Sequence, residues 1–165
     1  MNDDSDKKPE QRSRLLQLVE KIPIFSDLSL DNRNKILALC SKTVLDKGET
    51  LCVLGDESSA LYLLLMGKLA VKVHNSTVAT IDPVTSIGEM GVFTGEPRSA
   101  TVEAMEKSAI LTLKKEDLDR LIEADPEIGV KIMRRVIGIL SGRVSSDNIR
   151  IREFQNYLLD ENSPQ

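Results

Sequence analysis

The middle of the chain is built from short apolar runs separated by polar segments. Between residues 43 and 113 the runs are TVL, TLCVL, ALYLLLM, LAVKV, TVATI, ATVEAM and AILTL. The segments between them, such as DKGE, GDESS, GK, HNS and DPVTS, are rich in turn-forming residues. Short strands at this spacing predict an antiparallel barrel or sandwich.

The apolar pattern has a helical period on both sides of this region. SRLLQLVEKIPIF, from Ser13, predicts a short amphipathic helix that Pro23 stops. SLDNRNKILALCSK predicts a second helix with Ser29 as its N-cap and an inner face of Ile36, Leu37, Leu39 and Cys40. KEDLDRLIEA predicts a third short helix, and Pro126 suits the first turn of a long final helix.

The final helix carries a heptad pattern. Its members are spaced alternately by four and three, and one of them is polar: Met133, Ile137, Leu140, Val144, Asp147, Ile151, Phe154 and Leu158. A second strip, Ile132, Val136 and Ile139, stops at Arg143. We therefore expect the first half to bury a wide face on its own domain. The second half keeps a narrow stripe for a partner helix or a lid. Homodimerisation is the prediction, and packing within one chain is the alternative.

These patterns divide the chain into four parts. Residues 1–12 are expected to be a disordered leader, and residues 13–126 a β-domain with N-terminal helices. Residues 127–159 are expected to form a lid or dimerisation helix, and residues 160–165 a frayed tail.

Composition limits the class of protein. The chain has 165 residues, which favours one domain, and 41% are apolar, which is enough for a real core. Only 3% are aromatic and none is Trp, so stacking platforms for single-stranded nucleic acid are not expected. The formal net charge of −4 also disfavours a nucleic acid partner.

Cys40 and Cys52 have no metal-binding spacing and are expected to be reduced thiols. The polar start of the chain is no secretory signal, and no apolar run could span a bilayer, so we expect a cytoplasmic protein without a membrane partner.

One stretch, SIGEMGVFTGEPRSATV from Ser86 to Val102, carries the candidate chemistry. GEMGVF predicts a single helical turn whose free N–H groups favour a phosphate. Arg98 adds a forked set of donors that matches phosphate oxygens, and Ser99 adds a hydroxyl. Gly88 and Gly91 let a ligand approach the backbone.

Glu89 needs a separate explanation, because a carboxylate repels a phosphate. It fits if it accepts a hydrogen bond from a ribose 2′-OH, as acidic residues do in dinucleotide sites. Together Glu89 and Arg98 then describe a compact nucleotide with one anionic phosphate. The alternative is a surface ion pair between Glu89 and Arg98 on a hairpin, which would contribute little.

The residues GEMGVFTGEPRSATV resemble the phosphate-binding cassette of cyclic nucleotide-binding domains. The resemblance is to a stand-alone, bacterial-type domain and extends over residues 25–148, including DKGETLCVLGDESSALYLLLMGKLAV and DPEIGVKIMRRVIGILSGRV. It implies an α+β fold: an antiparallel, jelly-roll-like β-roll of about eight strands, N-terminal helices, a short phosphate-binding helix and a long C-terminal helix.

The resemblance also implies roles for individual residues. Glu89 would bind the ribose 2′-OH and Arg98 the cyclic phosphate. Backbone or hydroxyl contacts to ribose and phosphate would come from Gly88, Met90, Gly91, Ser99 and Ala100. The last helix would cover the purine through Arg143, Val144 and Asp147. LCVLGD and DPVTSIGE depart from the family pattern, but neither departure touches Glu89 or Arg98.

The predicted function is a non-enzymatic sensor that binds cyclic AMP, favoured over cyclic GMP, and shifts its last helix by a change in populations. The downstream partner is not named by the sequence. The alternative is a structural dimerisation module with an empty pocket. A hydrolase is disfavoured because His74 is the single histidine and neither a nucleophile–base pair nor a metal cluster is visible. A transcription factor is disfavoured because no DNA-reading helix is predicted.

Overall fold

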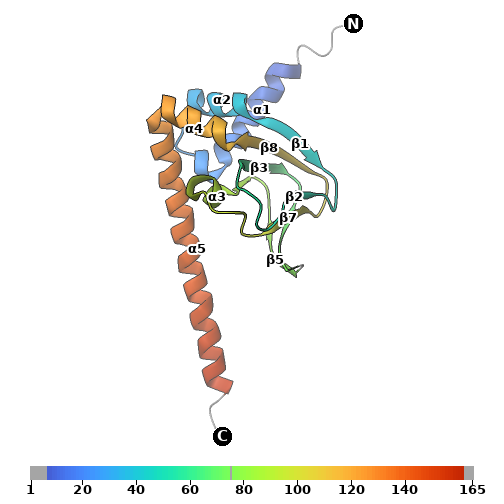
Figure 1. Cartoon of the computed structure of the whole chain (residues 1–165), viewed down its shortest axis with the longest axis vertical. Coiled ribbons are helices and arrows are strands. Elements are labelled where there is room, and N and C mark those ends of the chain that lie inside the picture. Colours follow the sequence, from blue (N-terminus) through green and yellow to red (C-terminus); the bar gives the residue numbers. More distant parts are fainter. Residues whose placement is uncertain (1–6, 75, 162–165) are drawn as a thin grey trace.

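Two four-stranded antiparallel sheets form a β-roll in the computed structural model, which describes residues 7–74 and 76–161. One sheet has the order β1 (Ser41–Leu45), β8 (Ser108–Lys114), β3 (Ala60–Met66) and β6 (Thr85–Ile87). The other has the order β2 (Thr50–Cys52), β7 (Thr101–Ala104), β4 (Leu69–Val73) and β5 (Ser76–Ile81). The predicted jelly-roll-like fold is confirmed (Figure 1).

The strand β6 was not among the runs expected to be strands. It has only three residues, Thr85–Ile87, and follows the turn sequence DPV, so neither length nor alternation marks it. Its partner decides its conformation, because Tyr62, Leu63 and Leu64 of β3 pair with it. This pairing places Gly88 and the stretch after it beside β3.

The strand β3 is buried on both faces, which explains its continuous apolar sequence. Leu61, Leu63 and Leu65 belong to a core shared with the helices. Leu64 belongs to a second core inside the roll, with Leu69, Val102 and Ile110, and Tyr62 packs against it. β3 is therefore the wall between the helical layer and the interior of the roll.

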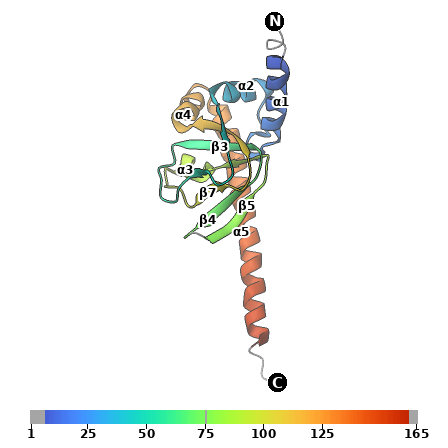
Figure 2. The same ribbon diagram turned by 90° about the vertical axis from the view of Figure 1, so that its right-hand side faces the viewer.

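The helical layer consists of α1 (Lys7–Lys21), the 3₁₀ turn η1 (Pro23–Phe25), α2 (Leu30–Leu39) and α4 (Lys115–Ala124). In both views these elements lie at the end of the roll from which the last helix starts (Figure 2). α1 begins at Lys7, so residues 7–12 are helical and not part of a disordered leader. The apolar period starts only at Leu15, but Pro9 is tolerated in a first turn, where N–H groups need no helical partner. Residues 1–6 of the expected leader lie outside the described residues.

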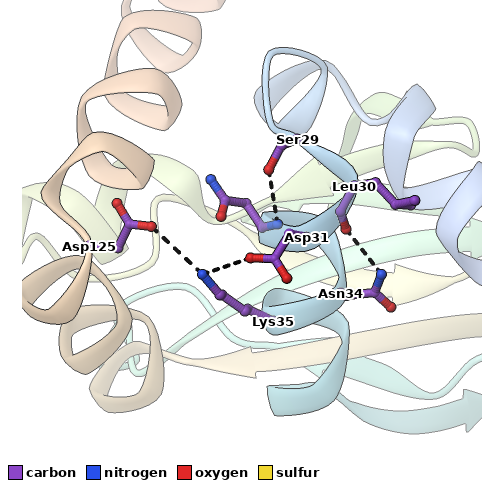
Figure 3. Close-up of polar contacts among 7 residues, drawn as sticks. Ser29, Leu30, Asp31, Asn34, Lys35 and Asp125 are labelled. Atoms are coloured by element: carbon purple, nitrogen blue, oxygen red, sulfur yellow. Dashed lines mark hydrogen bonds and ion pairs between the residues drawn. The ribbon is translucent and has the colours of Figure 1, made fainter.

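The helix α2 begins as predicted, because the Ser29 side chain accepts a hydrogen bond from the backbone N–H of Asn32 (Figure 3). Lys35 Nζ lies 2.8 Å from Asp31 and 3.9 Å from Asp125, which joins α2 to the start of the last helix. The predicted inner face is wrong at Leu39, because this last residue of the helix is exposed. Ile36 is buried, and Cys40 is a half-buried free thiol whose pKa burial raises to about 12.

The helix α5 (Pro126–Glu161) is two residues longer at its C-terminal end than expected and extends far beyond the β-roll (Figures 1 and 2). Its Ile128, Ile132 and Val136 are buried against the helical layer. Met133 and Ile137 are exposed, so the expectation that the first half buries the heptad positions is wrong there. Every residue from Ser141 to Gln155 is exposed. The side chain of Leu158 lies outside what the structure describes, and so do residues 162–165 of the expected tail.

Among the described residues, no helix is both long enough and apolar enough to cross a membrane. The same residues contain no group of three or more His, Cys, Asp or Glu side chains placed to hold a metal ion.

Candidate functional site

The site begins at Gly88, which links β6 to the short helix α3 (Glu89–Thr94). Gly88 is the N-cap and adopts a left-handed conformation with φ of 85°. A Cβ atom at this position would lie 1.8 Å from Nη1 of Arg98. Gly88 is therefore required by the backbone conformation and by the space that the arginine occupies.

Arg98 is held from several sides although it lies in a loop. Its backbone N–H donates to the Asp56 carbonyl at 2.8 Å, and its carbonyl accepts from the Gly55 N–H at 2.9 Å. Its Nη2 donates to the Ala60 carbonyl at 2.5 Å, and its guanidinium lies over the Tyr62 ring. The side chain is only 6% exposed, so the arginine is a fixed and buried cation.

The charge of Arg98 has no carboxylate counterpart in the part of the chain that the structure describes. Its Nη1 is buried and has no hydrogen-bond partner, and no carboxylate among the described residues forms an ion pair with it. Burial raises the pKa of the neighbouring Cys52 thiol, and the positive charge of Arg98 acts against that rise. A buried cation without a carboxylate is unfavourable, so this position is suited to an anion from outside the chain.

Glu89 lies on the first turn of α3 and is only 3% exposed. Its Oε1 lies 3.0 Å from Nη1 of Arg143, which comes from α5 and is more than half exposed. The alternative of a surface pair between Glu89 and Arg98 is therefore wrong, because both are buried and Glu89 pairs with another arginine. The long helix thus reaches the candidate site through Arg143.

The remaining predicted residues differ in their placement. Gly91 is buried, and a Cβ there would lie 2.0 Å from Ser58 Oγ, which donates to the Glu96 carbonyl. Ala100 is half-buried, while Met90, the second residue of α3, and Ser99, next to Arg98, are exposed. On α5, Val144 and Asp147 are exposed, and Asp147 lies 3.9 Å from Arg150.

The helix α3 has six residues, so its dipole supplies little of the positive charge expected for a phosphate. Arg98 carries that charge instead. The sequence reasoning missed the residues that hold Arg98, namely Ala60 and Tyr62. Nothing in the apolar run of β3 signals such a role, except that Tyr62 is its one aromatic residue.

A groove of about 650 Å³ lies elsewhere, between η1 and α5. Its lining includes Pro23, Ile139 and the pair formed by Asp27 and Arg135, and it contains neither Glu89 nor Arg98. Both arginines of the groove, Arg134 and Arg135, are exposed, and Arg135 donates two hydrogen bonds to the Asp27 carboxylate, so neither is a buried cation like Arg98. The candidate site is therefore assigned from Arg98 and Glu89.

A buried arginine without a carboxylate, beside a glycine-capped short helix on a β-roll, describes a site suited to a small anion. The model of the cyclic nucleotide-binding domain family matches residues 42–125, and the chain belongs to this family.

The chain is similar to several known proteins. It is 30% identical over 112 residues to a cyclic nucleotide-gated potassium channel of Mesorhizobium japonicum, covering 68% of this chain and 31% of the channel. It is 31% identical over 115 residues to the regulatory subunit of a cAMP-dependent protein kinase of Yarrowia lipolytica, with the same coverage. The chain thus spans about a third of the length of these curated relatives.

Solved structures agree over a larger share of the chain. A cyclic nucleotide-binding domain from Methylobacillus flagellatus has a TM-score of 0.69 at 25% identity and covers 94% of this chain and 86% of its own. The catabolite activator protein of Thermus thermophilus has a TM-score of 0.68 at 25% identity, covering 81% of this chain and 63% of its own. Membership of the family supports binding of a cyclic nucleotide and a regulatory role.

Proposed function

We propose that the chain is a non-enzymatic, cytoplasmic sensor that binds a cyclic purine mononucleotide, cyclic AMP in preference to cyclic GMP. The observation that carries the proposal is Arg98, a buried cation whose Nη1 lacks a partner. A cyclic phosphate has one negative charge and exposed oxygens, which would compensate this cation and accept its N–H groups.

The other contacts of the nucleotide follow from the same arrangement. Glu89 accepts the ribose 2′-OH in this proposal, since it is the buried carboxylate on the helix beside Arg98. Gly88, Gly91 and Ala100 offer backbone groups, while the exposed Met90 and Ser99 border the ligand. Arg143, with Val144 and Asp147 after it on α5, is proposed to contact the base. The preference for adenine rests on Ser99, because a threonine after the arginine is often linked to cyclic GMP in the family that this stretch resembles.

Calorimetric titration of the purified chain with each nucleotide tests the proposal. We expect cyclic AMP to bind with micromolar or tighter affinity, and Arg98→Ala to weaken it at least about 100-fold, because a charge-assisted contact is lost from a buried site. Arg120→Ala is the matched control, since Arg120 is an exposed arginine of α4 that pairs with Asp117. No heat and no thermal shift with either nucleotide would contradict the proposal.

The contact between Glu89 and Arg143 is the proposed link from the ligand to α5. A 2′-OH that donates to Glu89 competes with or reorients the Arg143 guanidinium 3.0 Å away, so one position of α5 binds ligand better than another. Hydrogen–deuterium exchange of residues 139–150 should therefore change when nucleotide is added. Arg143→Ala should reduce that change, while Arg150→Ala, an exposed arginine two turns further along, should not. Identical exchange with and without ligand would sink the proposed movement.

The proposed partner of α5 is a second copy of the chain. Of the heptad positions whose side chains are described, Leu140 is half-buried against the helical core and the others are exposed. They form a stripe that runs past the domain, with Ile137 67% and Phe154 63% exposed. The same α5 stripe on two chains can pair as a coiled coil, because apolar residues repeat at the spacing that such pairing needs. The stripe also supports the second candidate function, a dimerisation module in which the nucleotide site is unused.

Sedimentation equilibrium tests this pairing. We expect a dimer for the native chain and a shift to monomer for Ile151→Ser combined with Phe154→Ser, since both side chains are exposed members of the stripe. Arg152→Ser is the matched control, because Arg152 is exposed but lies off the heptad spacing. A native chain that is monomeric at all accessible concentrations would contradict the dimer. If the chain dimerises but binds no nucleotide, the second candidate function replaces the first.

A further inference from the structure

The guanidinium of Arg98 lies over an aromatic ring of the neighbouring strand. Its central carbon is 4.9 Å from the centroid of the Tyr62 ring, within the range in which an aromatic face attracts a cation. Tyr62 is on β3, two residues after Ala60, whose carbonyl accepts the hydrogen bond from Nη2. The Ala60 carbonyl and the Tyr62 ring therefore both hold the arginine from the first three residues of β3.

These contacts orient the free nitrogen of the arginine. Ala60 engages Nη2, the Tyr62 ring lies against the guanidinium, and Gly88 provides the space for Nη1. Arginine has a long side chain with many rotamers, and a ligand that had to order it would bind more weakly. Here the guanidinium is held before any ligand arrives, and Nη1 remains without a partner.

The identity of residue 62 is informative because aromatic residues are rare in this chain. Two Tyr and three Phe occur among 165 residues, and the other members of β3 that face a core are aliphatic. A leucine would fill the half-buried position of Tyr62 as an apolar side chain. Only an aromatic ring would also stabilise a cation with its face.

We infer that Tyr62 is a positioning residue that holds the Arg98 guanidinium ready for an anionic ligand. The ring face does this, and the hydroxyl does not. The consequence for cyclic nucleotide affinity rests on the proposed function, whereas the stacking itself is a property of the ligand-free chain.

The first experiment measures the stacking without a ligand. An aromatic face shields nuclei above it, so the side-chain NMR signals of Arg98 should be shifted upfield in the native chain and in Tyr62→Phe. The shift should be absent in Tyr62→Leu, and Arg98→Lys assigns the signals. Equal Arg98 shifts in Tyr62→Leu and in the native chain would overturn the inference, whether or not the chain binds a nucleotide.

The second experiment measures cyclic AMP affinity by calorimetry. We expect Tyr62→Leu to bind about 5- to 30-fold more weakly, the range that a desolvated cation–π contact supports. Tyr62→Phe should stay within about 2-fold of the native chain, because the ring is kept. Phe25→Leu is the control for loss of stability, since Phe25 is fully buried in the helical core away from Arg98.

The pattern across these variants separates the outcomes. Equal weakening in Tyr62→Phe and Tyr62→Leu would assign the effect to the hydroxyl and overturn the inference. Equal weakening of cyclic AMP binding in Phe25→Leu and Tyr62→Leu would mean that Tyr62 acts only through packing, and it would also overturn the inference. If the native chain binds no nucleotide, the proposed function fails, and the NMR result alone decides the role of Tyr62.

Discussion

The two buried arginines, Arg33 and Arg98, have almost the same burial but different surroundings. Arg33 is 9% exposed and lies 3.0 Å from Glu20, so α1 supplies a carboxylate for its charge. Arg98 is 6% exposed, and no described carboxylate forms an ion pair with it. Each has one buried nitrogen without a partner, Nε in Arg33 and Nη1 in Arg98. Burial and an unpartnered nitrogen are therefore common to both arginines, and the missing carboxylate is what sets Arg98 apart.

The two regions also differ in how they are built. Arg33 joins two helices, and Glu20 is more than half exposed, so water screens that pair. Arg98 lies in a loop between α3 and β7, held by Gly55, Asp56 and Ala60, all of which precede it by about forty residues. The first arrangement stabilises the helical layer. The second holds a buried cation that no described carboxylate compensates.

Replacing each arginine by methionine should give the largest contrast. We expect Arg98→Met to lose at least about 100-fold in cyclic AMP affinity while its free energy of unfolding stays equal or rises, because an uncompensated buried charge is removed. Calorimetric titration and urea unfolding of the ligand-free chain measure the two effects. A large loss of stability would mean that Arg98 is mainly structural.

Gly88→Ala should be the next largest change, because it combines backbone strain with a clash. A Cβ in the left-handed conformation costs about 1 kcal/mol, and the 1.8 Å approach would displace Nη1 of Arg98. We therefore expect lower stability and at least about 10-fold weaker binding. Gly48→Ala is the matched control, since Gly48 has φ of 88° but nothing lies within 4 Å of its Cβ position. Equal effects on binding in the two variants would refute the contact with Arg98.

Arg33→Met should have a smaller effect than these two changes, and it should lower stability without changing affinity. We expect a loss of about 1 kcal/mol in the free energy of unfolding, because one ion pair with a partly exposed partner is removed and Glu20 stays solvated. Cyclic AMP affinity should not change, which calorimetry would check. A parallel loss of affinity would mean that the helical layer and the site are coupled, and it would weaken the comparison.

The smallest effect on stability is expected from removing the exposed ion pair between Arg135 and Asp27. Arg135 donates to Asp27 and holds the pKa of that carboxyl below its ordinary value of 3.8. Because the pKa of Asp27 is lower in the folded chain, the unfolded chain takes up the proton first as the pH falls. The pair therefore stabilises the fold above pH 3.8, and this contribution is lost as the pH falls through the lower pKa of the folded chain. Asp27→Asn should remove that part of the acid dependence in thermal melts between pH 2 and pH 5, and unchanged curves would show that the pair contributes nothing. Nucleotide binding near neutral pH should be unaffected.

The fold could be predicted largely from local patterns. Short apolar runs between turns identified seven of the strands, and Ser29 and Pro126 marked the starts of α2 and α5 correctly. The three-residue strand β6 was missed because pairing with β3 decides it. The start of α1 was missed because residues 7–12 carry no apolar period.

The candidate site divides in the same way. Glu89, Arg98 and the glycines around them lie close together in sequence, and their residue types alone point to a ribose and a phosphate. Ala60 and Tyr62 precede Arg98 by more than thirty residues and belong to a strand with an ordinary apolar sequence. The partner of Glu89 could not be predicted either, since Arg143 is more than fifty residues away on another element.

The sequence by itself determined most of the strand and helix pattern, the family and the two charged residues of the candidate site, because these depend on residue types at short spacing. Only the tertiary structure decided that Arg98 is buried without a carboxylate, that Tyr62 lies beneath it and that Glu89 contacts α5. Charge compensation depends on which distant groups come within a few ångströms, and that is a property of packing.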